Sequence, residues 1–347
     1  MGFLEANRYL YLTTPLGDDK LLLRGFEGVE ALSKLFRFEL EMEAENTTSV
    51  DFDKLIGQKV SFGVQGADPS DIPRHFHGIV IEMVQEARGT HLTSYSMTVA
   101  PDIWKLSCKY RSRIFQHIKI PDVLKQLFTG FDASYEIQGT FEEREYVVQY
   151  QESDLDFASR LMEEEGIYYF FKFTKGAHKL VLANTPQSHL DLPGGSQIIF
   201  EAIEGGERDD ERITSWTKEQ HWGSGKYTLW DHHFQLPHKK LDAEQIIMDS
   251  VQAGKVTHKL KLSGNEELEV YENPGRYAQR FDGIDRAGGE KSADLQKIFD
   301  DNKRTTGIRM QQEETPTILI HGESNHWRLT PGYNSLSSAT STPTAST

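Results

Sequence analysis

The chain has 347 residues, which is room for about two or three domains. Its 53 acidic and 38 basic residues give a formal net charge of −15 at pH 7, which argues against binding along a nucleic-acid backbone. No apolar run is long enough for a membrane-spanning helix, and the N-terminus has no secretory signal pattern. The single cysteine, Cys108, excludes an intrachain disulfide and a cysteine-based metal site.

The first hundred residues are predicted to form strands. Between Lys34 and Glu43, apolar residues alternate with charged ones, which is the pattern of a strand with one buried and one wet face. Similar short segments recur as far as Pro101 and are separated by Gly, Asp and Pro. The pattern predicts about five to seven antiparallel strands that fold as a barrel or a sandwich.

The middle of the chain has a different character. Residues 119–130 are amphipathic, with Pro121 at the first turn and Gly130 at the end, which predicts a short helix. A second helix is predicted between Ser153, which can cap its start, and Gly166, which can end it. The "GIYYFF" that follows is apolar on both faces, as in a buried strand. These interspersed elements predict an α+β insertion.

Strand patterns return near residue 196. The predicted elements of this half are strands at 196–204 and 212–237, a charged and less structured stretch at 238–267, a helix at 290–304, strands at 307–313 and 316–322, and a disordered Ser/Thr-rich tail from residue 334. Two strand-rich halves around an insertion favour a duplicated barrel, although the amino-acid sequence shows no exact internal repeat.

Three consecutive acids, Glu163, Glu164 and Glu165, stand before the aromatic run and could serve as a glycan-cleaving site. A glycosidase needs two carboxylates that face each other at roughly 5 to 9.5 Å. Adjacent residues on a helix diverge by about 100°, so these glutamates alone do not supply that geometry. Three acids in the last turn also oppose the helix dipole. We therefore expect them to face a basic surface, with Arg160 as the local candidate and a neighbouring subunit as the larger one.

Histidines form two further candidate clusters. His75 and His77 share one face of a predicted strand, as zinc ligands can, but no third ligand lies nearby in the sequence. Asp231, His232 and His233 are adjacent, so successive side chains point to opposite faces. We expect the histidines of both clusters to be exposed strand residues, and we assign no catalytic, cofactor-binding or metal-ligating residue.

Four long segments carry a family resemblance. They are "RSRIFQHIKIPDVLKQLF", "YVVQYQESDLDFASRLMEEEGIYYFF", "GKYTLWDHHFQLP" and "LEVYENPGRYAQRFDG". In this order they closely resemble the N-terminal part of VgrG proteins, the spike proteins of the bacterial type VI secretion system. That part is similar to the hub of contractile phage baseplates, and the resemblance covers roughly residues 7–333.

The resemblance implies a mainly β fold with an α+β insertion and two antiparallel β-barrel tube domains of the phage baseplate hub kind. The predicted domains are a first tube barrel at 1–105, the insertion at 106–195, a second tube barrel with a charged insertion and a helix at 196–333, and the tail at 334–347. A full spike continues with an OB-fold and a β-helix needle, so we expect the hub part alone here.

The implied function is structural and not enzymatic, and it requires no cofactor. The chain would form a homotrimer, cap the hexameric inner tube (the Hcp protein in secretion systems), contact baseplate proteins and help deliver effector or adaptor proteins. It would assemble in the bacterial cytoplasm and be exported by the machine without a signal peptide. A phage or phage-derived tail hub is the alternative, and a hydrolase of cell-wall glycan is a hypothesis from a different class.

Overall fold

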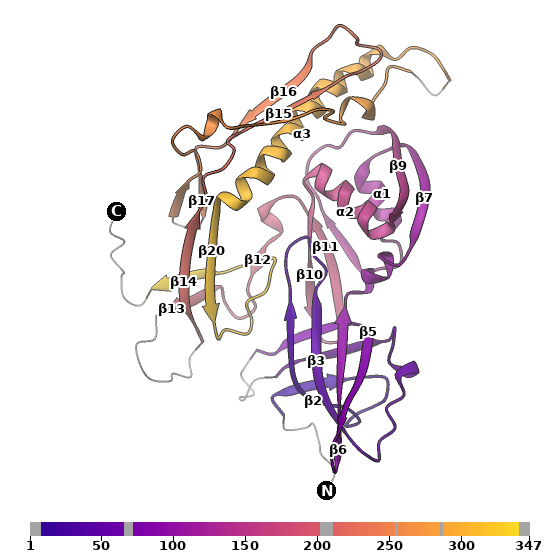
Figure 1. Cartoon of the computed structure of the whole chain (residues 1–347), viewed down its shortest axis with the longest axis vertical. Coiled ribbons are helices and arrows are strands. Elements are labelled where there is room, and N and C mark those ends of the chain that lie inside the picture. The colour runs from indigo at the N-terminus through magenta and orange to yellow at the C-terminus, as the bar shows by residue number, and fades with distance from the viewer. Residues whose placement is uncertain (1–7, 66–71, 202–210, 254–255, 285–286, 340–347) are drawn as a thin grey trace.

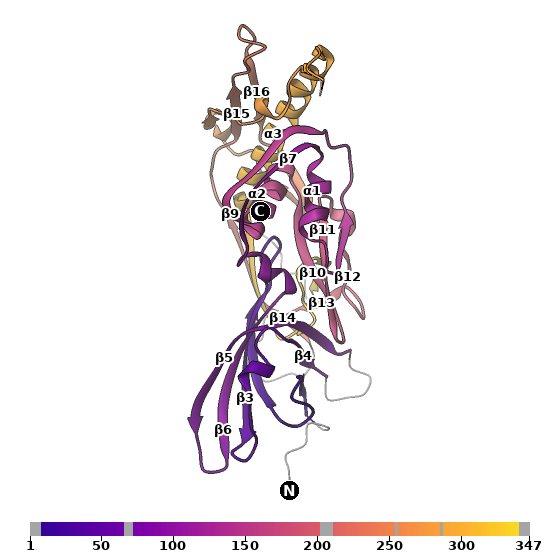
Figure 2. The ribbon, with the colours of Figure 1, turned by 90° about the vertical axis from the view of Figure 1, so that its right-hand side faces the viewer.

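The computed structural model of the chain describes residues 8–65, 72–201, 211–253, 256–284 and 287–339. Figures 1 and 2 show an elongated molecule, with the N-terminal strands at one end and the helices of the middle segment above them. Most of the regular structure is β and most strand pairs are antiparallel, which confirms the predicted fold class. Within the described ranges, no helix is both long and apolar enough to cross a membrane.

The N-terminal residues form one antiparallel sheet that nearly closes into a barrel. Its strands are β1 (Leu10–Thr13), β2 (Leu22–Val29), β3 (Arg37–Glu45), β4 (Lys59–Val64), β5 (Arg74–Arg88) and β6 (Leu92–Ala100), with 3-10 helices η1 (Phe52–Lys54) and η2 (Asp102–Leu106). The sheet order is β1-β4-β5-β6-β3-β2, and its two end strands contact each other. In β3, Phe38, Leu40 and Met42 are buried between exposed charged residues, as the alternation predicted.

The middle segment packs two helices against short strands. Its elements are β7 (Tyr110–Ile118), α1 (Ile120–Leu127), β8 (Ala133–Glu136), β9 (Arg144–Ser153), α2 (Asp154–Glu165), β10 (Tyr168–Thr174) and β11 (Ala177–Ala183). β7 and β9 form a two-stranded ribbon, and β10, β11 and β8 form a second sheet. Pro121 lies in the first turn of α1, as predicted. Phe170 and Phe171 of "GIYYFF" are buried, which confirms the prediction of a core strand.

One hydrophobic core runs through the barrel and the middle segment. Phe36, just before β3, lies with its ring centroid 4.9 Å from that of Phe171 and 5.1 Å from that of Phe173. The same cluster continues into α2 at Phe157. The predicted boundary at 105/106 therefore separates two segments that share a core, and the domain limits stay a prediction.

The C-terminal half forms several small sheets around a long helix. Its elements are η3 (Pro186–Ser188), β12 (Leu190–Asp191), β13 (Gln197–Phe200), β14 (Arg212–Gln220), β15 (Lys226–Asp231), β16 (Leu241–Ile246), β17 (Ser250–Ala253), β18 (Val256–Lys259), η4 (Asn265–Glu267), β19 (Glu269–Glu272), η5 (Ala278–Arg280), η6 (Ser292–Leu295), α3 (Gln296–Glu314), η7 (Thr315–Thr317), β20 (Ile318–Ser324), β21 (Tyr333–Asn334) and β22 (Leu336–Ala339). The sheets are β20-β14-β13-β22, β16-β15-β19, β12-β21 and β17-β18. The described strands of this half are open sheets, and a second barrel stays a prediction.

The predicted strand at 307–313 is instead part of α3. The buried positions of this helix are Ile298, Asp301, Asn302, Thr305, Thr306, Met310 and Glu314. Five of these seven are polar, so the apolar periodicity that reveals an amphipathic helix is interrupted. Locally, Ile308 and Met310 alternate with polar residues, and this alternation resembles that of a strand.

Two other stretches are also more regular than predicted. The charged residues 238–267 contain β16, β17, β18 and η4. At the C-terminus, Asn334 belongs to β21 and Leu336–Ala339 forms β22, which pairs in parallel with β13. Backbone hydrogen bonds organise these strands, and backbone pairing does not require an apolar side-chain pattern. The rest of the predicted tail, 340–347, lies outside the described residues.

A C-terminal segment returns to the N-terminal barrel. Arg74 in β5 donates from Nη1 to the carbonyl oxygen of Trp327 at 2.5 Å, and its Nη2 pairs with Glu30. The indole Nε1 of Trp327 donates to the carbonyl of Ile72 at 3.4 Å. These bonds join residues that are 253 and 255 positions apart, so they tie the two halves of the chain together.

Candidate functional site, a buried ion network between α2 and α3

The three candidate glutamates lie in the last turn of α2. The Ser153 hydroxyl accepts a hydrogen bond from the backbone N–H of Asp156 at 3.0 Å and so caps the helix start. Gly166 ends the helix in the left-handed conformation, with φ of 66°. Both caps confirm the sequence prediction. Because they fix where the helix begins and ends, they place the glutamates in its last turn.

Glu164 and Glu165 face arginines, which agrees with the expectation that these glutamates face a basic surface. Arg144, at the start of β9, donates from Nη1 to Glu164 Oε2 at 2.6 Å, and its Nη2 pairs with Glu165. Arg160 donates to Glu164 Oε1 at 3.3 Å, so the predicted local partner is confirmed. The Arg144 side chain is only 6% exposed and that of Glu165 only 4%, so the pair is inside the protein.

The C-terminal half supplies the other side of the network. Arg304 of α3 pairs with Glu165 through Nη2, and the same nitrogen lies 3.0 Å from Asp301 Oδ1. Arg280 of η5 donates to Asp301 Oδ2 at 2.7 Å and lies 3.5 Å from Glu164 Oε2. Side chains from α2, β9, η5 and α3 therefore meet in one cluster.

The network balances its charges. It comprises four cations and four anions: Arg144, Arg160, Arg280, Arg304, Glu152, Glu164, Glu165 and Asp301. Burial by itself would raise the pKa of Glu164, but attraction to Arg144 and Arg280 outweighs burial and holds this pKa below its usual value. Arg280 and Arg304 lower the pKa of Asp301 in the same way, against the opposing effect of burial. Both carboxyls are therefore ionised at neutral pH.

This geometry does not support the hydrolase hypothesis. A general acid needs a raised pKa so that it holds a proton near neutral pH, and the pKa of Glu164 is shifted the other way. Glu165 is bound by two arginines. The remaining glutamate, Glu163, is exposed and accepts a hydrogen bond from Gln312 at 3.2 Å. It lines a pocket of about 560 Å³ between α2 and α3, and none of the other residues that line this pocket is acidic.

The two histidines of β5 are not brought together as a metal site. The Nδ1 atom of His75 lies 2.6 Å from the hydroxyl of Tyr11. The prediction of an exposed histidine is wrong for His77, which is buried because it packs against β11, and its Nδ1 lies 2.8 Å from the Nδ1 of His178. The backbone N–H of Asp102 donates to His178 Nε2, so His178 carries its proton on Nδ1 and donates it to His77. No group of three or more metal-ligating side chains gathers in the described part of the chain.

The second candidate cluster is also structural. Asp231, at the end of β15, is buried and accepts hydrogen bonds from the backbone N–H groups of Tyr277 at 3.0 Å and Ala278 at 3.1 Å. His233 Nε2 lies 3.0 Å from the carbonyl oxygen of Phe281, while the side chain of His232 is exposed. These bonds fasten the segment after β19 onto the end of β15.

The sequence did not single out Arg144, Arg280, Asp301 or Arg304. Each stands among other charged or polar residues, and local patterns do not show that a charged side chain is buried. A weak signal was present in α2 itself, because three acids at a helix C-terminus require opposite charges nearby. That signal predicted the kind of partner and not its position.

We expect acidification from pH 6.5 to about 4 to destabilise the fold through His178. Burial lowers the pKa of His178 from 6.5 to about 4, so in this window the unfolded chain binds a proton that the folded ring does not. The free energy of unfolding therefore falls as the pH falls. In His178→Gln, the drop in Tm between these pH values should be smaller than in the unaltered chain. The exposed His232→Gln is the control, and equal drops in both variants would contradict the assignment.

The near-closed barrel, the open sheets and the buried ion network define a mainly β protein whose charged cluster is structural. The chain belongs to the phage tail baseplate hub (GPD) family, which matches residues 29–339. The resemblance inferred from the sequence is thereby confirmed.

Curated relatives carry the names of secretion spikes. The type VI secretion system spike protein VgrG1b of Pseudomonas aeruginosa is 34% identical over 286 residues, which are 82% of this chain and 37% of that protein. The actin cross-linking toxin VgrG1 of Vibrio cholerae is 28% identical over 280 residues, which are 77% of this chain and 24% of that protein. The chain thus spans about a third or less of the length of these two relatives.

Solved structures of similar proteins include the E. coli c3393 protein. It is described as a component of the type VI secretion system with structural similarity to the T4 bacteriophage tail proteins gp27 and gp5. The match has a TM-score of 0.49 and 21% sequence identity, and it covers 58% of this chain and 56% of that one.

Proposed function

We propose that this chain is a structural, non-enzymatic hub of a contractile injection machine of the type VI secretion kind. It forms a homotrimer, seats the end of a hexameric inner tube of the Hcp kind on baseplate proteins, and contributes to the delivery of effectors. It assembles in the bacterial cytoplasm and leaves with the machine. Family membership and the names of the relatives support this role.

The observation that carries the proposal is the ribbon formed by β14 and β20. Trp216 pairs with Gly322 and Lys218 with Ile320 across this antiparallel ribbon. Nearly all of β20 is exposed, including Leu319 and Ile320 on opposite faces of the ribbon, and β20 is the edge strand of its sheet. An edge strand with exposed apolar residues requires a neighbour. Figure 1 shows the ribbon on the left of the molecule, at the height of the middle segment and above the N-terminal barrel.

We expect the purified chain to form ring-shaped trimers and Ile320→Glu to prevent their assembly. The substitution places a carboxylate in an apolar contact, where burial of its charge opposes association. Light scattering measures the mass, and electron microscopy shows the ring. Ile246→Glu is the matched control, since Ile246 in β16 is 43% exposed and Ile320 is 42% exposed. Trimers of Ile320→Glu, or a monomeric unaltered chain that does not bind the hexameric tube protein, would refute the proposal.

A phage or phage-derived tail hub is the alternative role, and the description of the matched family favours it. Both roles use the same architecture, so the two differ in their partners. Neighbouring genes for a secretion sheath and its membrane complex support the secretion role, whereas genes for tail and capsid proteins support the phage role.

A further inference from the structure

The β7–β9 ribbon carries large apolar side chains on both of its faces. On the inner face, Phe115 stacks on Phe157 of α2 with ring centroids 5.7 Å apart, and Val147 is buried. On the outer face four large side chains are exposed to solvent, and we call them the β7–β9 face: Tyr110 (70% exposed), Ile114 (59%), Tyr146 (48%) and Tyr150 (68%). Strands that are apolar on both faces are typical of sheets covered on both sides. The described residues of the single chain leave this outer face uncovered.

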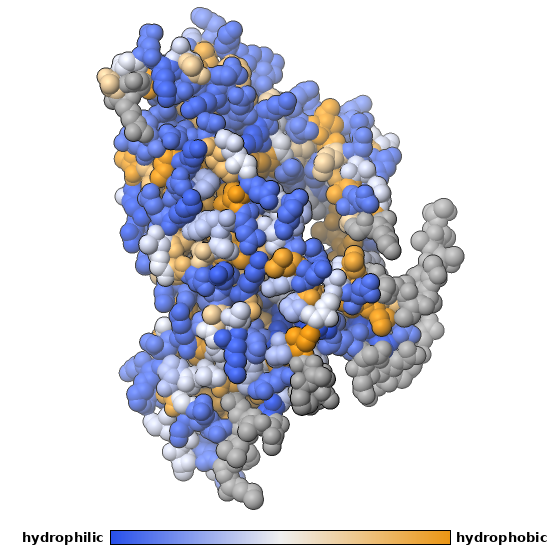
Figure 3. All heavy atoms as spheres, turned by 180° about the vertical axis from the view of Figure 1, so that it is seen from behind, coloured by the Kyte–Doolittle hydropathy of each residue, from blue (hydrophilic) through white to orange (hydrophobic). Residues whose placement is uncertain are grey.

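Strand pairing gathers these side chains into one stripe. Ile114 pairs with Val148, and Gln116 pairs with Tyr146, so Ile114 and Tyr146 are diagonal neighbours on one face. Tyr146, Val148 and Tyr150 are every second residue of β9, so their side chains lie on the same face of that strand. Elsewhere, on the side of the molecule seen in Figure 3, apolar residues form separate patches in a largely hydrophilic surface. A continuous apolar stripe is typical of an interaction site.

The same ribbon carries the densest basic segment of an acidic chain. Lys105, Lys109 and Arg111 are exposed before and at the start of β7. Neither lysine pairs with a carboxylate among the residues that the structure describes, whereas Arg111 already forms an ion pair with the buried Asp154 at 3.4 Å. Because the whole chain carries −15, this region is opposite in sign to the rest of the molecule. It therefore favours an acidic partner.

We propose that the β7–β9 face, with Lys105 and Lys109 beside it, docks an acidic protein segment that carries aliphatic or aromatic side chains. The partner's apolar side chains cover the tyrosines and Ile114, and its carboxylates meet the two lysines. A twofold pairing of this face with itself is a poorer match, because the lysines of one copy would oppose those of the other. The face lies on the right of Figure 1 and the β14–β20 ribbon lies on the left, so both surfaces can be occupied at once.

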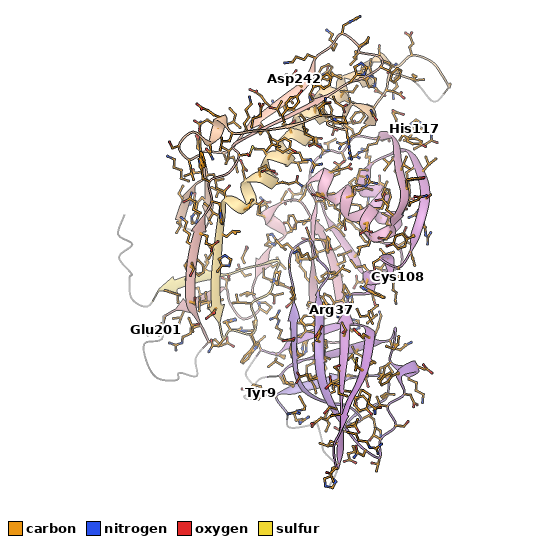
Figure 4. The ribbon with its side chains drawn as sticks, viewed as in Figure 1. Tyr9, Arg37, Cys108, His117, Glu201 and Asp242 are labelled. Carbon is orange, nitrogen blue, oxygen red and sulfur yellow. The ribbon has the colours of Figure 1, made fainter. Side chains whose placement is uncertain are left out.

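A short dye-labelled peptide that alternates glutamate and leucine tests the proposal on the full chain by fluorescence anisotropy. We expect saturable binding that weakens at least about tenfold in the double variant Ile114→Ser/Tyr150→Ser, and that weakens with added salt. Cys108 is an exposed cysteine just before β7, and Figure 4 labels it at one end of the ribbon and His117 at the other. Bound peptide should therefore slow the alkylation of Cys108.

Two controls separate docking from general stickiness. Tyr271→Ser removes a tyrosine of β19 that is 58% exposed and should leave peptide binding unchanged. A peptide that alternates lysine and leucine should not bind. Equal binding of both peptides, or full binding by the double variant, overturns the proposal. So does self-association of the unlabelled chain that the double variant abolishes, because the occupant is then a second copy.

Discussion

Replacing Arg144 by methionine should lower the free energy of unfolding by about 3 kcal/mol. Methionine keeps much of the packing volume of Arg144, but it leaves the buried carboxylate of Glu165 with Arg304 as its remaining cation. Removing one partner of a buried ion pair costs roughly 3–5 kcal/mol, because the other charge stays away from water. Arg160 and Arg280 still reach Glu164, which places the cost at the lower end. Urea denaturation followed by circular dichroism measures it.

The control for this experiment is Arg24→Met. Arg24 also pairs with a glutamate, Glu43, at 3.0 Å, but its side chain is 58% exposed. Exposed ion pairs contribute roughly 0–1 kcal/mol, so this change should be nearly neutral. Adding Glu165→Gln to the Arg144→Met variant should restore part of the loss, because the network then again holds equal numbers of cations and anions. Equal losses for Arg24→Met and Arg144→Met would contradict a structural role of the network.

Phe36→Ala should destabilise the chain by about 3–5 kcal/mol, the usual cost of emptying a buried aromatic site. Phe36 is 2% exposed, and its ring meets Phe171, Phe173 and His178 with centroids 4.9, 5.1 and 5.5 Å away. These contacts join the barrel to β10 and β11, so the cavity lies where the two segments share their core. Urea denaturation gives the energy, and hydrogen exchange should show faster opening of both segments together.

Phe234→Ala makes the same substitution at a position that is 65% exposed. Changes at exposed sites are usually within about 0.5 kcal/mol, so this variant should behave almost as the unaltered chain. If Phe36→Ala speeds exchange in the barrel alone, the barrel and the middle segment open independently and do not share one cooperative core.

The four segments that carry the family resemblance show what the local sequence can and cannot predict. Two of them form the paired strands β7 and β9. The other two form the parallel pair β15 and β19, and the Asp231 carboxylate at the end of β15 accepts a hydrogen bond from the backbone N–H of Tyr277 after β19. The sequence marked these segments and their order, but not that they pair with each other. Strand pairing depends on contacts between distant residues, and one strand's pattern does not identify its neighbour.

The sequence by itself determined the elements whose causes are local. Ser153 and Gly166 delimit α2 because capping acts within one turn, and β3 alternates because a strand has a period of two. The extent of α3 was not predicted from its local pattern, because the buried face of this helix includes the polar residues Asn302 and Thr306.

Only the tertiary structure decided what the glutamates of α2 face. Their arginines lie 20 or 21, 116 and 139 positions away in the chain, at Arg144, Arg280 and Arg304. The local sequence does not show whether a charged residue is solvated or buried, because its burial depends on the elements that pack around it. The three acids at the end of α2 showed that positive charge was needed, and the packing of β9, η5 and α3 supplied it.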